Sequence, residues 1–147
     1  MLSYVTSMFQ YSPLPNGGET NLATLLKNMR PKLNEGEYVF CTVGNNFQIN
    51  NTDIICFFRE NEGTTLILNK NVADALLLPY NYIAAWITLT VHSSLEATGL
   101  TATFSAALAE AGISCNVVAA YYHDHIFVDK KDAERAMGVL EQLSTNV

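Results

Sequence analysis

The sequence is poor in charge, in cysteine and in long apolar runs. Charged residues make up 15% of the 147-residue chain, and 8 lysines and arginines against 14 aspartates and glutamates give a net charge of −6. Because a negative surface repels phosphates and no basic cluster offsets it, we expect no nucleic-acid partner. No segment approaches the roughly 18 apolar residues that span a bilayer, so we expect no membrane partner. The hydrophobic fraction of 49% predicts a packed core instead.

The sequence also has few cysteines. The three cysteines, Cys41, Cys56 and Cys115, are widely spaced and lie in apolar, β-branched segments. An odd number without a CxxC pair is atypical of a disulfide framework or a zinc ribbon, so we expect free buried thiols in a reducing compartment. The N-terminus lacks the basic and apolar regions of a secretory signal. We therefore predict a cytoplasmic protein.

The first half of the chain predicts an extension followed by helices and strands. Prolines and an Asn-Gly-Gly cluster mark residues 1–18 as an extension or linker. Beyond it, apolar spacing and capping residues indicate each element in turn. The expected elements are a helix with Leu22, Leu25, Leu26 and Met29 on one face, a strand over 38–43, a hairpin of strands over 54–59 and 64–68, and a short helix capped by Asn69.

The second half has a clearer pattern. Alternation predicts a strand over 86–92, with Ile87, Leu89 and Val91 on one face. A helix follows and ends at Gly112. Its apolar face comprises Leu100, Phe104, Ala107, Leu108 and Ala111. Strands over 113–121 and 125–128 and a last helix capped by Asp129 complete the half.

The two halves share a short repeat at a constant offset of 60 residues, from 67 to 127. Ile67-Leu68-Asn69-Lys70 aligns with Phe127-Val128-Asp129-Lys130, and Ala73-Asp74 aligns with Ala133-Glu134. Each half also has a helix, a strand with a cysteine, a hairpin strand and a second helix in that order. We interpret this pattern as a duplication, with halves at 19–83 and 84–147.

The order of elements predicts an α+β fold. A β-α-β-β-α order is typical of ferredoxin-like βαββαβ units, here in tandem, with antiparallel sheets and helices on one face. The second half has no strand after its last helix, and the first has no clear strand before its first helix. Since an uncovered sheet edge promotes association, the missing strands must come from the other half or from a partner chain. We therefore expect closely packed halves and a homodimer.

Two segments of the second half resemble the ACT domain, a small regulatory module. Residues 89–100 resemble its first strand and the following loop, in which Gly99-Leu100 match the end of the family's Pro-Gly-x-Leu pattern while Thr98 replaces the proline. Gly112-Ile113 match the family's helix exit. Residues 121–128 are similar to a signature of bacterial tandem-ACT proteins. The resemblance covers about 19–143 and implies an ACT-like fold related to the regulatory domains of aspartate kinase and to the eukaryotic arginine sensor.

The resemblance implies a non-catalytic regulatory protein that binds a small molecule, often an amino acid. The ligand is expected at the ACT interface near the Gly99 loop, between the first strand and the first helix. A helix start at Gly99 offers free amides to a carboxylate, and Glu96 could receive an ammonium group. Simple helix capping also accounts for the serines and Thr98, and a solvated charge for Glu96. The predicted ligand-binding residues are His92, Ser93, Ser94, Leu95, Glu96, Thr98, Gly99, Leu100 and Asn116.

All three histidines fall in the second half. In a ferredoxin-like sheet, His92 at the end of the first strand and His123 and His125 at the start of the third lie at one edge. Neutral imidazoles converging with Asp124 could bind zinc or nickel, or a protonated imidazole could hold a carboxylate. A hydrogen-bonded hairpin end accounts for the same residues. A metal-binding protein or hydrolase at these histidines is therefore an alternative function.

Other catalytic signals are weak. Ser93 or Ser94 beside His92 and Asp124 suggests a triad, but no GxSxG nucleophile elbow accompanies them. The sequence contains no P-loop or dinucleotide-binding glycine motif, so we expect no cofactor. A third hypothesis is a purely structural dimerisation module whose sheet edges pair with another protein.

Overall fold

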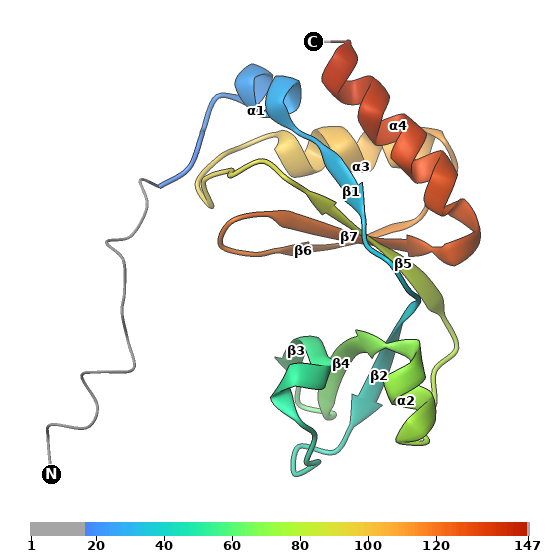
Figure 1. The fold of residues 1–147 in the computed structure, drawn as a ribbon. Coiled ribbons are helices and arrows are strands. Elements are labelled where there is room, and N and C mark those ends of the chain that lie inside the picture. The colour runs from blue at the N-terminus through green and yellow to red at the C-terminus, as the bar shows by residue number, and fades with distance from the viewer. Residues whose placement is uncertain (1–16, 147) are drawn as a thin grey trace, which may run out of the picture.

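A single antiparallel sheet of seven strands organises the chain (Figure 1). The computed structural model describes residues 17–146, so residues 1–16 of the predicted extension lie outside the described part. The strand order is β3-β4-β2-β5-β7-β6, and β1 pairs with β5 beside this path. The strands are β1 (Pro31–Leu33), β2 (Tyr38–Val43), β3 (Ile54–Arg59), β4 (Thr64–Asn69), β5 (Ile83–Leu89), β6 (Cys115–Ala119) and β7 (Asp124–Asp129).

The sheet consists of two ferredoxin-like units that share a strand. The first unit has the order β3-β4-β2-β5, and the second has the order β6-β7-β5-β1. The two orders are equivalent, with β5 as the last strand of the first unit and the first strand of the second. The fourth strand of the second unit is β1, which comes from the first half of the chain. The expectation that one half supplies a missing strand to the other is therefore confirmed.

The segment from Pro31 to Val43 pairs with β5 twice, once through β1 and once through β2. Pro31 pairs with Leu89 at one end of β5, and Tyr38 pairs with Ala84 at the other. Between them the backbone amide of Asn34 donates to the carbonyl of Trp86 over 2.8 Å. Our sequence prediction missed β1, because a three-residue strand that begins with proline has too little apolar alternation to indicate a strand.

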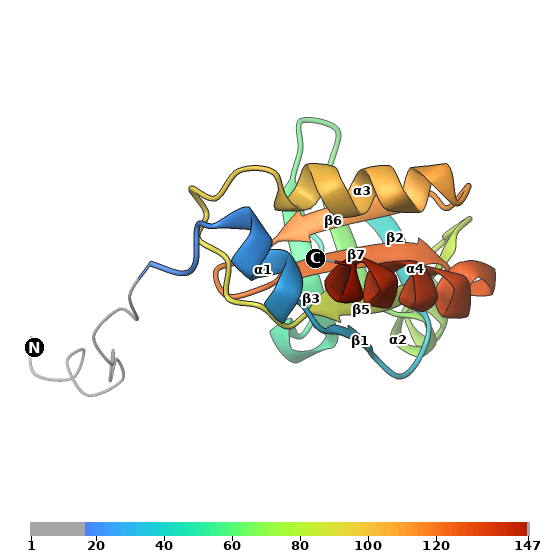
Figure 2. The same ribbon diagram turned by 90° about the horizontal axis from the view of Figure 1, so that it is seen from above.

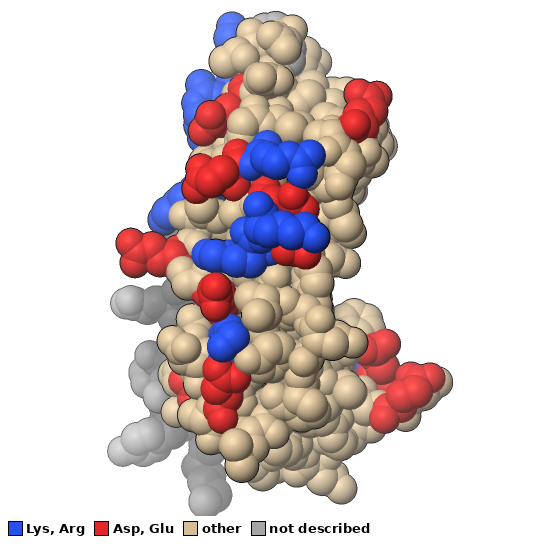
Figure 3. Space-filling model, turned by 90° about the vertical axis from the view of Figure 1, so that its right-hand side faces the viewer, with Lys and Arg blue, Asp and Glu red and all other residues tan. Residues whose placement is uncertain are grey.

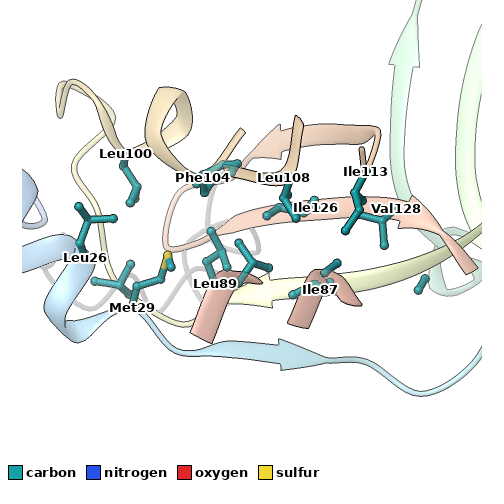
Figure 4. Close-up of a cluster of buried hydrophobic side chains, with 14 of the residues drawn as sticks. Leu26, Met29, Ile87, Leu89, Leu100, Phe104, Leu108, Ile113, Ile126 and Val128 are labelled. Atoms are coloured by element: carbon teal, nitrogen blue, oxygen red, sulfur yellow. The ribbon is translucent and has the colours of Figure 1, made fainter. Parts of the chain in front are cut away.

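Helices α1 (Leu22–Asn28), α3 (Leu100–Glu110) and α4 (Ala133–Thr145) lie together over one face of the second unit (Figure 2). Asn21 caps α1 by accepting from the amide of Thr24 over 3.0 Å. The apolar face predicted for α1 is confirmed, since Leu25 and Met29 are fully buried. Figure 4 shows how side chains of α1 and α3 meet those of the strands in one core, to which α4 contributes Ala136 and Leu140. Its labelled residues are Leu26, Met29, Ile87, Leu89, Leu100, Phe104, Leu108, Ile113, Ile126 and Val128.

The repeat led us to treat the first helix of one half as equivalent to the first helix of the other, and this part of the prediction is wrong. We paired the helix before Cys41 with the helix before Cys115, but α1 packs on α3 and α4 rather than on the first unit. Within the first unit, β2 is a central strand like β5, and the loop after it contains only the short 3₁₀ helix η1 (Asn51–Asp53) where the second unit has α3. The helix that covers the first unit is the short α2 (Lys70–Ala75).

The strand predicted over 86–92 is shifted towards the N-terminus. It begins at Ile83 and ends at Leu89, because the amide of Val91 already turns back to the carbonyl of Leu89 over 2.9 Å. The other predicted strands of the second half also shorten or lengthen by one or two residues at their ends. His92 therefore lies in the loop beyond β5 and not in the strand.

The opposite face of the sheet carries an aromatic layer. Side chains alternate along a strand, so residues next to those of the helix-covered core point to the other side. The ring of Phe40 meets the ring of Phe127 edge-on with centroids 5.4 Å apart, and Trp86 stacks on Phe127. Within residues 17–146, no helix packs on this layer, which comprises Tyr38, Phe40, Tyr82, Trp86 and Phe127.

Charged side chains are dispersed over the surface. On the side of the molecule that Figure 3 shows, lysine and arginine side chains alternate with acidic ones instead of forming one basic patch. Arg135 pairs with Asp132 at 2.7 Å, and Lys70 pairs with Asp74 at 2.9 Å. In the described part of the chain, no helix has both the length and the apolar character needed to cross a membrane.

Candidate functional site

The loop from Thr90 to Gly99 connects β5 to α3. A strap from the N-terminal segment holds it: the amide of Glu19 donates to the carbonyl of His92 over 3.0 Å, and the amide of Ser94 donates to the carbonyl of Glu19 over 2.9 Å. Gly18 makes this close approach possible, because a Cβ there would lie 2.5 Å from the Ser94 nitrogen. The loop is thus fixed by Gly18 and Glu19, which lie some 70 residues before His92 in the chain.

A cavity of about 290 Å³, the loop pocket, opens along this loop. It brings together His92, Ser93, Ser94, Leu95 and Glu96, which our sequence analysis predicts to bind a ligand. Gly17 and Tyr121 complete the lining. Among the side chains that line the loop pocket, Glu96 supplies a negative charge. The serine hydroxyls and the His92 ring supply hydrogen-bonding groups.

Tyr121 is a wall residue that our sequence analysis did not assign to the site. The His92 and Tyr121 rings lie 6.3 Å apart, and Tyr122 meets His92 at 5.3 Å and Tyr121 at 4.9 Å. Tyr121 is 44% exposed, so its ring faces the cavity mouth and not the core. The available signal was the pair of adjacent tyrosines where the strand predicted over 113–121 ends, since exposed aromatic residues at a loop are typical of binding sites.

A second hollow of about 70 Å³ shares Ser93, Ser94 and Leu95 with the loop pocket. It reaches the first turn of α3 at Leu100 and Thr101 and also contacts Asp124. Gly99 has no side chain to cap α3, so the first amides of this helix present a partial positive charge here. Burial raises the pKa of Asp124, and the nearby His123 opposes this shift. The second hollow therefore borders both the N-terminus of α3 and the carboxyl group of Asp124, whose pKa is raised.

The structure places four predicted residues outside the loop pocket, and one of them, Leu100, lines the second hollow. Neither hollow includes Thr98 or Gly99 in its lining. Gly99, with φ of 98°, faces Leu22 of α1, whose Cδ2 would lie 2.9 Å from a Cβ at this position. Asn116 lies in β6 and donates from Nδ2 to the carbonyl of Phe127 over 3.3 Å. It lines a different cavity on the aromatic side of the sheet.

The three histidines have separate surroundings. His92 contacts the tyrosines of the loop pocket, and His123 Nδ1 lies 3.4 Å from the carbonyl oxygen of Val91. His125 lies in β7 opposite Thr88, and its Nδ1 accepts a hydrogen bond from Trp86 Nε1 over 3.1 Å. Among residues 17–146, no group of three or more His, Cys, Asp or Glu side chains is arranged to hold a metal ion.

The first unit has a hollow at the equivalent position. A cavity of about 180 Å³ lies between the loop after β2 and strands β3 and β4. Its polar lining comprises Asn45, Gln48, Asn51, Arg59 and Thr64. This cavity occupies the space beside the loop that replaces a first helix in this unit. Our sequence analysis assigned no site to this asparagine-rich segment.

Comparisons with known proteins agree with this architecture. A family model described as "ACT domain" matches residues 17–85, and a second model with the same description matches residues 82–142. A search among curated proteins found no match.

Solved structures share the fold over most of the chain. The Vibrio cholerae protein VC0802, described as of unknown function and a possible transport protein, is 47% identical, with a TM-score of 0.72 over 84% of this chain and 95% of that one. Atu0741 from Agrobacterium tumefaciens is 16% identical, with a TM-score of 0.60 over 80% and 90%. The regulatory subunit of Thermus thermophilus aspartate kinase is 12% identical, with a TM-score of 0.56 over 77% and 95%.

Proposed function

The chain belongs to the ACT-domain family, with two such domains in tandem, and from this membership we propose that it is a non-catalytic regulatory protein whose ligand, an amino acid, binds in the loop pocket. ACT domains are regulatory modules that bind small molecules. What carries the proposal is the meeting of five sequence-predicted residues, His92 to Glu96, around one cavity.

The chemistry of the two hollows suits a zwitterion. Glu96 in the loop pocket is placed to receive an ammonium group, and the serine hydroxyls can bond to either end of the ligand. The first turn of α3, which borders the second hollow, favours a carboxylate. A ligand that reaches from one hollow to the other would satisfy both ends.

A regulatory role is favoured over the hydrolase alternative. A metal-assisted hydrolase would need His92, His123 and His125 to converge on one ion. His125 instead bonds to Trp86 and Thr88, while His92 packs against Tyr122 in the loop pocket. Ligand binding would regulate a partner if two arrangements of the protein differ in affinity for the amino acid.

A thermal-shift screen of the proteinogenic amino acids tests the proposal. A true ligand raises the melting temperature with its concentration. Glu96→Gln is expected to reduce this rise several-fold, because it removes the charge that receives the ammonium group. Glu141→Gln on the exposed side of α4 is the matched control and keeps the full response. If no amino acid raises the melting temperature, or if Glu96→Gln responds fully, the proposal is wrong.

The structure also supports a homodimer through β3. This strand is an edge strand of the sheet, and its Phe57 and Phe58 are 53% and 69% exposed. An edge strand with exposed aromatic residues favours pairing with another copy. Phe58→Lys should convert a dimer to a monomer in size-exclusion chromatography with light scattering. The free thiols of Cys41, Cys56 and Cys115 favour a cytoplasmic location, because reducing compartments keep cysteines unpaired.

A further inference from the structure

The first-unit cavity, which is the hollow between the loop after β2 and strands β3 and β4, has the features of a second binding site. Its volume is about 180 Å³. In the second unit, α3 covers the corresponding face of the sheet, and its Phe104 and Leu108 are fully buried in the core there. In the first unit, a loop and the short η1 take the place of this helix. The cavity is the space that they leave unfilled.

The floor of the first-unit cavity is apolar. Leu66 of β4 is 2% exposed and belongs to the buried cluster of the first unit. Phe57 lies opposite Leu66 in the pairing of β3 with β4, but it remains 53% exposed. Val43, Ile49 and Ile54 pack against the same buried cluster and complete the floor. A ligand with a short apolar body would therefore remove apolar surface from water here.

Arg59 supplies a positive charge at the rim of the first-unit cavity. It follows Phe57 by two residues in β3, so the two side chains lie on the same face of the strand. The Arg59 Cζ lies 6.0 Å from the centre of the Phe57 ring, which borders the cavity. Within residues 17–146, no carboxylate forms a salt bridge with Arg59. Its planar guanidinium group is thus available to hold a carboxylate through two parallel N–H donors.

The neutral polar side chains of the rim can donate hydrogen bonds. Asn45 Oδ1 accepts from Thr64 Oγ1 over 2.8 Å, which leaves the Asn45 Nδ2 group to donate to another molecule. Gln48 also lines the cavity and carries a second side-chain amide. Among the described residues that line it, none is an aspartate or glutamate, so an ammonium group would meet Arg59 without a compensating negative charge. The rim therefore favours an anion over a zwitterion.

The two units thus have cavities of opposite charge. Glu96 gives the loop pocket a negative side chain, whereas Arg59 gives the first-unit cavity a positive one. An amino acid carries both an ammonium group and a carboxylate, but the first-unit cavity has a charged partner for the carboxylate alone. The chemistry of the cavity therefore selects a ligand that has the carboxylate and the apolar body but no ammonium group.

We propose that the first-unit cavity binds a short aliphatic carboxylate without an amino group, such as a 2-oxo acid. The carboxylate pairs with Arg59, the 2-oxo oxygen accepts a hydrogen bond from Asn45, and the aliphatic chain lies on Leu66. The cavity is smaller than the roughly 300–1,000 Å³ of sites for drug-sized ligands, which limits the chain to a few carbons. This site is independent of the amino-acid site in the loop pocket.

Isothermal titration calorimetry with 2-oxobutanoate as the probe tests the proposal. Arg59→Gln should weaken binding by about tenfold or more, because it removes the charge that pairs with the carboxylate. Arg59→Lys keeps the charge but loses the planar pair of donors, so its affinity should be intermediate. Asn45→Ala should weaken binding several-fold. Lys27→Gln, which removes an exposed positive charge from α1, is the matched control and should bind like wild type.

The Glu96→Gln variant separates this site from the loop pocket. It should bind 2-oxobutanoate like wild type, whereas 2-aminobutanoate, which has an ammonium group in place of the oxo group, should bind to it about tenfold more weakly than 2-oxobutanoate or worse. Inorganic phosphate, an anion without an apolar body, should also bind more weakly than 2-oxobutanoate.

The melting temperature of Arg59→Gln without the probe provides a check on folding. It should change little, because Arg59 is exposed and forms no salt bridge within residues 17–146. The proposal is overturned if 2-oxobutanoate does not bind, if Arg59→Gln keeps full affinity, or if phosphate binds as tightly as 2-oxobutanoate. Equal affinity of Glu96→Gln for 2-aminobutanoate and 2-oxobutanoate would overturn it as well.

Discussion

The indole Nε1 of Trp86 donates a hydrogen bond to Nδ1 of His125 over 3.1 Å across two neighbouring strands. Thr88 Oγ1 lies 3.2 Å from the same nitrogen, and Asn34 Nδ2 donates to Thr88 Oγ1 over 2.9 Å. Because an indole N–H only donates, Nδ1 of His125 must accept, and the neutral imidazole carries its proton on Nε2. The network connects the segment between β1 and β2 to β5 and β7.

Acidification should break this hydrogen bond. Burial lowers the pKa of His125, and the nearby His123 lowers it further. The native state therefore binds fewer protons than the unfolded chain below about pH 6.5. The stabilisation from the neutral imidazole is complete above that pH and is lost as the pH falls towards the lowered pKa.

The fluorescence of Trp86, the single tryptophan, measures the change directly. Between pH 7 and pH 5 we expect a change in emission together with a lower free energy of unfolding. His125→Gln, which cannot titrate, should show no change in emission and should lack the part of the stability loss that comes from His125, while His92→Gln should behave like wild type. A titration of His125→Gln that matches wild type would contradict this prediction.

Asp124→Asn should stabilise the protein at neutral pH. Burial raises the pKa of Asp124, so the native state retains a proton at pH values where the unfolded chain has lost it. The free energy of unfolding should consequently fall as the pH rises from about 4 through the raised pKa. Urea unfolding of both proteins from pH 4 to pH 8 measures the difference. We expect the variant to gain most at the upper end, and a constant difference across the range would argue against a buried, titrating carboxyl group.

Gly99→Ala should destabilise the protein by about 1–3 kcal/mol. Two costs combine here, since φ is 98° and a Cβ would lie 2.9 Å from Leu22 Cδ2. The double variant with Leu22→Ala removes the steric cost and leaves the backbone strain. Chemical unfolding of the four proteins of this cycle separates the two terms, with a favourable coupling energy expected between the substitutions. Strict additivity would show that Leu22 does not limit the space at Gly99.

Leu25→Ala in α1 should cost about 2–5 kcal/mol of stability. Leu25 is fully buried among residues of α3, α4 and β5, so its truncation leaves a hole in the core of the second unit. Leu77→Ala is the control, because Leu77 is 89% exposed and should change stability little. Equal losses in the two variants would contradict the assignment of α1 to this core.

Local sequence signals predicted the helices and most strands well. The repeat at an offset of 60 residues corresponds to two equivalent caps: Asn69 accepts from the amide of Asn71 over 2.9 Å, and Asp129 accepts from the amide of Lys131 over 3.0 Å. Each capping hydrogen bond joins residues two positions apart, so the local sequence is enough to predict it. The site at His92 to Glu96 was predicted from the resemblance to the ACT domain, although His92 itself was expected in the strand over 86–92, which ends at Leu89.

Contacts between distant segments were not predictable in the same way. Nothing in the three-residue β1 indicates that it pairs with β5, which lies more than 50 residues later, as in Leu33 opposite Ile87. Asn116 was assigned to the loop site as a side chain that could supply hydrogen bonds, but it faces the aromatic side of the sheet. Whether a side chain borders one cavity or another depends on strand register and on the face of the sheet.

Hydrophobic periodicity, capping residues and the repeated segment thus determined the elements, the tandem α+β architecture and the loop where residues of the candidate site gather. These signals are local, and each acts within a few residues. Only the tertiary structure decided that β5 serves both units, that α1 covers the second unit, and that Tyr82 and Asn116 meet at a cavity of their own. The reason is physical: strand pairing and side-chain burial are satisfied between segments far apart in the chain, and many pairings are compatible with the same local pattern.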